Sequence, residues 1–85
     1  MTTTKVLILM GSDSDWGVMK TAWDTLNEFG VTCKAEVSSA HRSLERTLDL
    51  VRTADANGTE VFIVGAGAAA HLGGVVAAAT TKPVV

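Results

Sequence analysis

The chain has 85 residues, of which 47% are hydrophobic and 19% charged, and its formal net charge is −2. This length allows one domain at most, and the composition excludes a disordered chain. The small negative charge gives no broad basic field, so we expect no nucleic-acid partner, and any anion must be bound locally. The mean hydropathy of +0.29 is high for an independent domain of this size, which suggests apolar surface hidden against another chain.

Cys33 is the single cysteine, so we expect a buried structural thiol and neither an intrachain disulfide nor a CxxC motif. The N-terminal residues enter a short apolar run without the cleavage site of a secretory signal. No apolar stretch approaches the roughly 20 residues that span a bilayer. These features predict a cytoplasmic protein with no membrane partner.

The first predicted strand is the apolar run 6–10, which ends at Gly11 and is typical of a strand buried on both faces of a parallel sheet. The polar residues 12–15 predict the start of a helix over about residues 14–29, with Gly30 as its stop. The apolar residues of this helix form one stripe at three- and four-residue spacing: Trp16, Met19, Ala22, Trp23 and Leu26, with Phe29 near its end.

Residues 31–37 alternate between apolar and polar, which predicts a strand buried on one face and near a sheet edge. Ser43 can cap a second helix, and Gly58 can end it. The apolar stripe expected on this helix is Leu44, Leu48, Val51 and Ala54.

Residues 61–64 form a third apolar run that Gly65 breaks, and the nearly all-apolar residues 68–79 predict a helix in the core or in an interface. Val84 and Val85 look like the opening of a fourth strand. This alternation of strand and helix predicts an open parallel sheet covered by helices, with residues 1–85 as a single α/β domain.

In such sheets ligands bind outside the carboxyl ends of the strands. The three predicted strand ends are residues 11–15, 38–42 and 65–71, and every residue of chemical interest lies in one of them. The first, with two serines and two aspartates after Gly11, is explained equally well by a tight turn with a helix cap. Its backbone N–H groups and Ser12 could instead hold a phosphate, while Asp15 accepts from a ribose hydroxyl.

The second strand end carries His41 and Arg42. Arginine offers a fixed fork of donors for phosphate or carboxylate, and histidine exchanges a proton near neutrality. A bound anion beside an acid/base is what a decarboxylation or a proton transfer needs. A lone histidine is also often structural, so both interpretations stay open at this point.

The third strand end, residues 65–70, matches the pattern GxGxxA of dinucleotide-binding units. The acidic residue that this fingerprint needs about 20 positions further on is not in the chain, so a nicotinamide or flavin cofactor is weakly supported. The glycines can equally allow a close approach to any ligand. His71 follows, as a core polar contact or a ligand contact. Two histidines without a nearby cysteine predict no metal site.

Taken in order, residues 10–16, 37–42 and 65–72 resemble the N-terminal half of the N5-carboxyaminoimidazole ribonucleotide mutases of purine biosynthesis. The match covers essentially all 85 residues. It implies a flavodoxin-like three-layer α/β/α fold that ends here after three to four strands, an octamer, and a phosphorylated imidazole nucleotide as substrate. It also implies a cofactor-free transfer of a carboxylate from the exocyclic nitrogen to ring carbon C4.

The resemblance also implies residue roles. His41 would be the general acid/base, and Arg42 would lie near the phosphate. The substrate-binding positions implied by the three motifs are Gly11, Ser12, Asp15, Ser39, Ala40, Arg42, Gly67, Ala70, His71 and Leu72. Ala68 and Gly73 depart from the glycine and the proline usual in the family's third motif.

The second half of the family is not in this sequence and could come from a separate chain. Three alternatives therefore stand beside the mutase: an inactive structural or nucleotide-binding remnant, an aminoimidazole ribonucleotide carboxylase using free CO2, and an unrelated dinucleotide-binding fragment.

Overall fold

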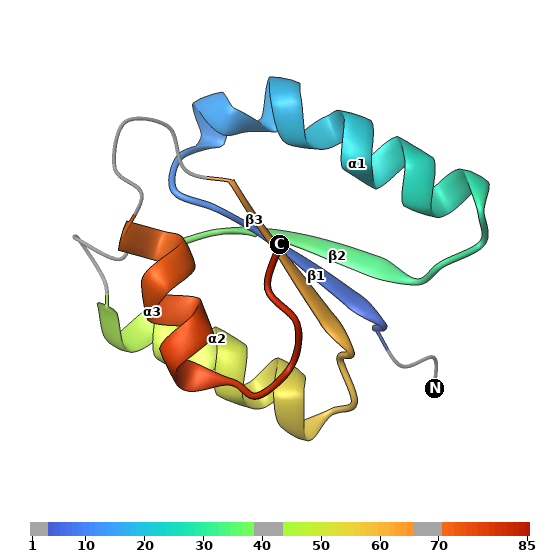
Figure 1. Cartoon of the computed structure of the whole chain (residues 1–85). Helices are drawn as coiled ribbons and strands as arrows, with labels where there is room; N and C mark the ends of the chain where they lie inside the picture. Colours follow the sequence, from blue (N-terminus) through green and yellow to red (C-terminus); the bar gives the residue numbers. More distant parts are fainter. Residues whose placement is uncertain (1–3, 39–43, 66–70) are drawn as a thin grey trace.

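A computed structural model describes residues 4–38, 44–65 and 71–85. The chain forms three layers, with a parallel sheet between one helix on one face and two helices on the other (Figure 1). The strands are β1 (Val6–Met10), β2 (Cys33–Val37) and β3 (Val61–Gly65), and the helices are α1 (Trp16–Glu28), α2 (Leu44–Ala56) and α3 (His71–Ala79). The predicted alternation of strand and helix is confirmed.

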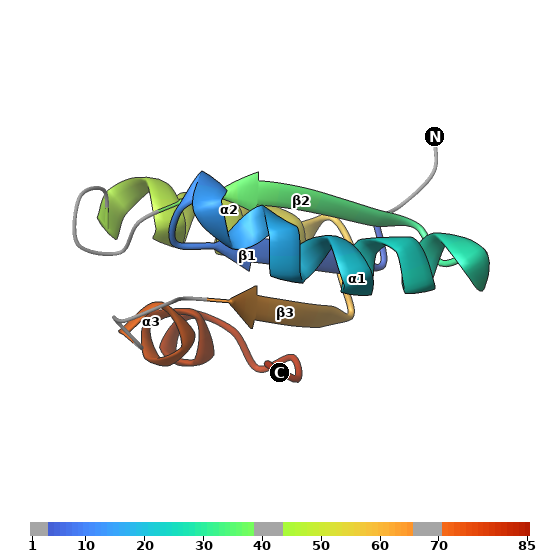
Figure 2. The ribbon, with the colours of Figure 1, turned by 90° about the horizontal axis from the view of Figure 1, so that it is seen from above.

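The sheet has the order β2-β1-β3, so the first strand is central and pairs in parallel with both others. Figure 2 shows β1 between its two neighbours, with the heads of all three arrows at the same edge. All five residues of β1 are buried, which confirms the prediction from its unbroken apolar run. The central first strand is the topology of flavodoxin-like sheets, whose order begins 2-1-3.

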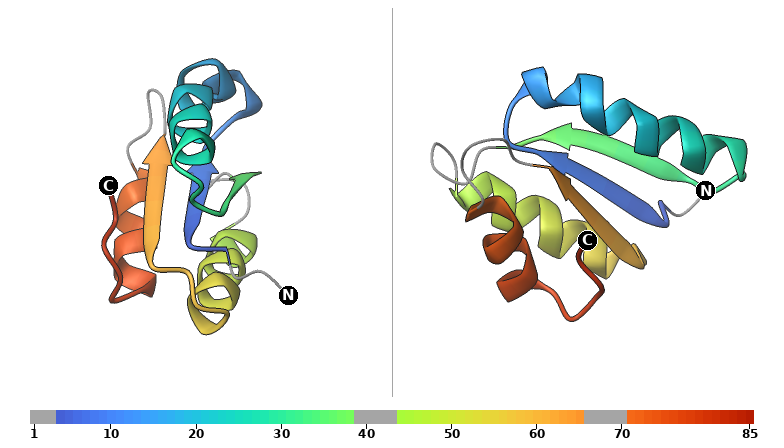
Figure 3. Two further views of the ribbon diagram at one scale, coloured as in Figure 1. Left: turned by 90° about the vertical axis from the view of Figure 1, so that its right-hand side faces the viewer. Right: turned by 45° about the horizontal axis from the view of Figure 1, so that its top comes forward.

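Side chains of β1 alternate between two cores. Leu7 and Leu9 belong to the core under α2 and α3, whereas Val6, Ile8 and Met10 belong to the core under α1. Figure 3 shows α1 on one side of the sheet and the other two helices on the opposite side. Because a strand alternates its side chains and both faces are covered, an uninterrupted apolar run is required here.

Helix α1 begins two residues later than predicted, because a 3-10 turn over Asp13–Asp15 precedes it. The predicted stripe is confirmed, since Met19 is buried in the core under this helix and the other four members pack against that core while partly buried: Trp16, Ala22, Trp23 and Leu26. Phe29 does not continue it: the residue is the C-cap, with φ −86° and ψ 4°, and is 77% exposed. Gly30 follows with φ +73°, the left-handed conformation expected at a helix stop.

Strand β2 lies at the sheet edge, as predicted, although it starts at Cys33 rather than at residue 31. The buried stripe of α2 was predicted partly wrongly. Leu44 is 47% exposed, and the buried residues of this helix are Thr47 and Val51, four positions apart. Leu44, the first residue of α2, precedes the part of the helix that packs on the sheet. The first buried residue of this helix is therefore Thr47.

Residues 83–85 extend the sheet beside β3. Val84 bridges Phe62 in parallel, and the Val85 N–H donates to the carbonyl of Phe62 at 2.9 Å. The predicted opening of a fourth strand is therefore confirmed. The preceding turn is held by Asp55 at the end of α2, which accepts from the Thr80 hydroxyl at 2.7 Å. None of the helices in the described ranges is long and apolar enough to cross a membrane.

We predict that Ile8→Ala lowers the free energy of unfolding by about 2–5 kcal/mol, because it opens a cavity at a residue with no exposed surface. Val18→Ala removes two methyl groups from a side chain that is 77% exposed and should change stability by less than about 0.5 kcal/mol. Urea unfolding measures both. Equal losses for the two variants would contradict the assignment of β1 to the centre of both cores.

Candidate functional site

The carboxyl ends of the three strands lie level with one another. Met10 is opposite both Val37 and Gly65 in the two strand pairs. Two backbone hydrogen bonds continue past this row: Ser38 N–H donates to the Met10 carbonyl at 2.8 Å, and Gly11 N–H donates to the Gly65 carbonyl at 3.1 Å. The predicted convergence of the strand ends at one edge is confirmed, and the connections leave from a hydrogen-bonded row.

The connection after β1 is organised by Ser12 and Asp15. Ser12 N–H donates to Asp15 Oδ2 at 3.1 Å, and Ser14 N–H donates to Ser12 Oγ at 3.3 Å. This pattern is a capping box: the Ser12 side chain caps the turn, and the Asp15 side chain accepts from the N–H of Ser12 itself. This explains the serine-aspartate run structurally, and the same two side chains stand at the ligand-binding edge of the sheet.

Gly65, the first glycine of the GxGxxA pattern, is explained by packing. A Cβ at this position would lie 2.3 Å from the Met19 sulfur, so glycine leaves room for the methionine of α1 at the end of β3, and any larger residue would require this flexible side chain to move. One of the two glycines that suggested a dinucleotide therefore has a structural reason in this fold.

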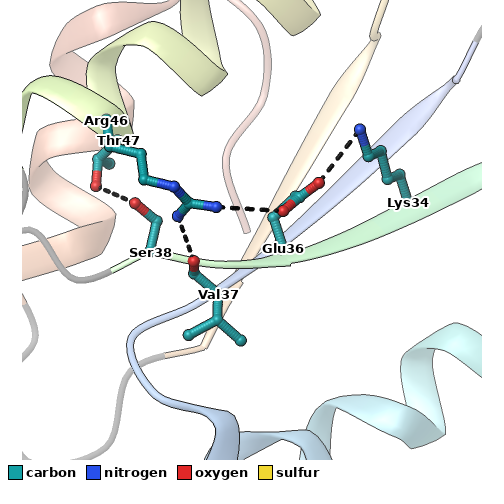
Figure 4. A network of polar contacts seen from close by, with 6 residues as sticks. All are labelled: Lys34, Glu36, Val37, Ser38, Arg46 and Thr47. Carbon is teal, nitrogen blue, oxygen red and sulfur yellow. Dashed lines mark hydrogen bonds and ion pairs between the residues drawn. The ribbon is translucent and has the colours of Figure 1, made fainter.

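The connection after β2 is held at both ends by contacts that the sequence alone did not reveal. Ser38 Oγ and Thr47 Oγ1 share a hydrogen bond of 2.7 Å, and the two residues are 3% and 0% exposed. Arg46 donates to the Val37 carbonyl (Figure 4). One feature of the sequence could have indicated this contact: Thr47 lies four residues before Val51, so it falls on the buried face of α2 despite being polar.

Most residues singled out at the second and third strand ends lie outside the described residues: Ser39, Ala40, His41, Arg42, Gly67 and Ala70. His71 is the first residue of α3. Leu72 is 2% exposed and packs in the core under α2 and α3. Leu72 therefore anchors the start of α3 at the carboxyl edge of the sheet.

An open apolar hollow of about 370 Å³ lies beside the carboxyl ends of β1 and β2, lined by Met10, Trp16, Ala35 and Val37. The four lining residues that belong to the described part of the chain are all apolar. The alternation over residues 31–37 predicts Val37 on the buried face of β2, but this side chain is 39% exposed because it lines the open hollow.

Cys33 is only partly buried, which is less than predicted, but burial still raises the pKa of its thiol. A raised pKa disfavours the reactive thiolate, so a structural role for this cysteine is supported. Within residues 4–38, 44–65 and 71–85, no group of three His, Cys, Asp or Glu residues could hold a metal ion.

These features define a doubly wound parallel α/β protein with its candidate site at the carboxyl edge of the sheet, around a central first strand. Residues 5–85 match the family model described as AIR carboxylase, and the chain belongs to that family.

Three relatives illustrate the match, each named N5-carboxyaminoimidazole ribonucleotide mutase. The protein from Pyrococcus abyssi is 54% identical over 95% of this chain and 47% of its own length. The one from Mycobacterium tuberculosis (strain H37Rv) is 51% identical over 95% and 47% of the two chains, and the one from Saccharolobus solfataricus 46% identical over 95% and 51%. The chain thus spans about half the length of these relatives, as the resemblance to an N-terminal half implied.

We predict that Gly65→Ala lowers the free energy of unfolding by about 1 kcal/mol or less, because the added methyl group displaces the flexible Met19 side chain, which must repack. Gly17→Ala is the matched control, since a methyl group added there on α1 would meet nothing within 4 Å, and alanine favours a helix. Urea unfolding compares them. The packing account is contradicted if Gly65→Ala is as stable as Gly17→Ala.

Proposed function

We propose that this chain carries the nucleotide-binding and acid/base residues of an N5-carboxyaminoimidazole ribonucleotide mutase, an isomerase of purine biosynthesis that acts in the cytoplasm. The observation that supports this most strongly is the 54% identity to a relative of that name across 95% of the chain. The level row of strand ends adds support, because it brings the starts of the three motif-bearing connections to one edge.

In the proposed reaction, the bond between the exocyclic nitrogen and the carboxylate carbon breaks, and its electron pair stays on nitrogen. His41 gives that nitrogen a proton as CO2 leaves. Ring carbon C4 then attacks the CO2, a carbon–carbon bond forms, and His41 takes back the proton from C4. One histidine is enough for both transfers because its ordinary pKa lies near neutrality, and atoms and charge balance without a cofactor.

The other proposed contacts are divided between the three connections. Arg42 binds the phosphate, and in the turn before α1 Ser12 contributes to phosphate binding while Asp15 accepts from a ribose hydroxyl. The capping box supports this, because it fixes both side chains at the row of strand ends. The proposed contacts to the imidazole and the CO2 come from Gly67, Ala70, His71 and Leu72. Gly11, Ser39 and Ala40 complete the proposed substrate-binding set.

A second candidate is an aminoimidazole ribonucleotide carboxylase that uses free CO2, because the matching family model is described as AIR carboxylase whereas the relatives are named as mutases. The two differ in substrate. The mutase converts the N5-carboxylated nucleotide in CO2-free buffer, and the carboxylase requires the free amine with added CO2. Turnover that appears only with added CO2 would favour the second candidate.

We further propose that the active particle is a homo-oligomer, an octamer by the family resemblance, and that it includes the residues corresponding to the relatives' second half, either in a longer chain or as a separate one. Native mass spectrometry, with the mass of the denatured chain beside it, tests this. A monomer of the 8.8 kDa chain with full turnover would contradict it.

We predict that His41→Asn abolishes the isomerisation and leaves nucleotide binding within a few-fold of the unsubstituted protein, because asparagine keeps a polar side chain but cannot exchange the proton. Turnover is followed by the change in absorbance of the carboxylated imidazole, and binding by calorimetry with aminoimidazole ribonucleotide. Unchanged turnover would remove His41 from the reaction.

Arg42→Gln should weaken nucleotide binding by about tenfold or more, since a hydrogen bond between charged groups contributes about 1.5–3 kcal/mol. Arg52→Gln, on the exposed surface of α2, is the matched control for the loss of one positive charge and should bind normally. Equal weakening by the two variants would mean that Arg42 acts only through net charge.

A further inference from the structure

The segment that carries His41 and Arg42 runs from the end of β2 to the start of α2, and a buried pair of hydroxyl groups joins these two elements. Ser38 is the residue after β2, and Thr47 lies in the first turn of α2. Their side-chain oxygens are 2.7 Å apart, and both residues are almost completely buried. Water is excluded from this hydrogen bond, and such a buried, satisfied polar pair favours one arrangement of its elements.

Arg46 makes a second contact between the same two elements. Its guanidinium donates to the Val37 carbonyl and lies 3.5 Å from the Glu36 carboxylate, which also pairs with Lys34 at 3.2 Å (Figure 4). Exposed ion pairs contribute little, but a hydrogen bond from a charged donor to a backbone carbonyl is among the stronger kinds. The first turn of α2 therefore contacts the end of β2 at two successive residues.

Ser38 also connects to the central strand. Its N–H donates to the Met10 carbonyl at 2.8 Å, while its side chain bonds to Thr47. One buried serine thus joins β1, β2 and α2 at the edge of the sheet where the ligand is proposed to bind. An apolar pair would fill the same core volume without directional constraint, so packing alone does not account for two hydroxyls here.

We propose that Ser38 and Thr47 are positioning residues for His41 and Arg42. The inference rests on the proposed function, because it concerns how the site of that reaction is held. Five residues, 39–43, separate Ser38 from the start of α2. In general, a short segment held at both ends has fewer conformations open to it than one that is free at an end. Misplacement of a reacting group by about 1 Å can reduce a rate about a hundredfold.

The test measures kcat and KM of the catalytically active protein and compares them with those of three variants: Thr47→Val, Ser38→Ala and the double variant. Each single change removes the same hydrogen bond, so we expect kcat to fall about ten- to a hundredfold in both. The double variant should lose no more than the worse single one, because the two residues act as a unit. Thr47→Ser restores a hydroxyl and should recover most of kcat.

Thr59→Val is the matched control. Thr59 is 1% exposed and donates to the Thr4 carbonyl at 2.9 Å, ahead of β3 at the opposite edge of the sheet. Thr59→Val, like Thr47→Val, removes the hydrogen bond of a buried threonine, so both variants should be less stable. Only Thr47→Val should also lower kcat. The inference is overturned if the two variants lose stability alike and both keep the unsubstituted kcat and KM.

Failure of the proposed function gives a different result. If the unsubstituted protein shows no turnover, the same variants are compared by the NMR signals of the His41 imidazole, assigned with His41→Asn. Positioning predicts that these signals move in Thr47→Val and Ser38→Ala and stay in place in Thr59→Val. Signals that stay in place in all three variants would overturn the positioning role independently of activity.

Discussion

The hydrogen bonding of β1 to both neighbours is the constraint on which the rest of the structure depends. This strand is buried on both faces, and its last residue is level with the last residues of β2 and β3. The Met10 carbonyl accepts from Ser38, and Gly11 donates to Gly65, so the three connections begin at fixed points. A site assembled from three separate stretches of sequence needs such a common origin, because sites on rigid elements are held more accurately than sites on free loops.

Much of this fold could be predicted from the sequence, because burial on two faces leaves a strong pattern. The unbroken apolar run of β1, the spacing of Trp16, Met19 and Trp23, and the stop at Gly30 each have one simple physical cause. The incorrect predictions fall where tertiary context overrides a local pattern. Phe29 leaves the helix at its C-cap, and Leu44 precedes the part of α2 that packs on the sheet.

The location of the candidate site could be predicted from the sequence, but most of the contacts that hold its connections could not. Residues of chemical interest follow each strand, and parallel topology brings strand ends together, so the edge itself could be inferred. The hydrogen bond between Thr47 and Ser38 could not be predicted, because a polar residue within an apolar stripe does not reveal which residue it pairs with. Ser12 and Asp15 were open to two interpretations, and the capping box shows that the structural one holds while leaving both side chains at the proposed ligand edge.

The central claim is that the nucleotide binds at the carboxyl edge of the sheet. The most direct test is to titrate the isotope-labelled protein with aminoimidazole ribonucleotide and to map the changes in backbone amide NMR shifts. We expect the largest changes at Gly11, Ser12 and Ser38 and in the adjoining motif residues. Changes concentrated instead at the opposite edge, around Lys5, Thr32 and Glu60, would contradict it.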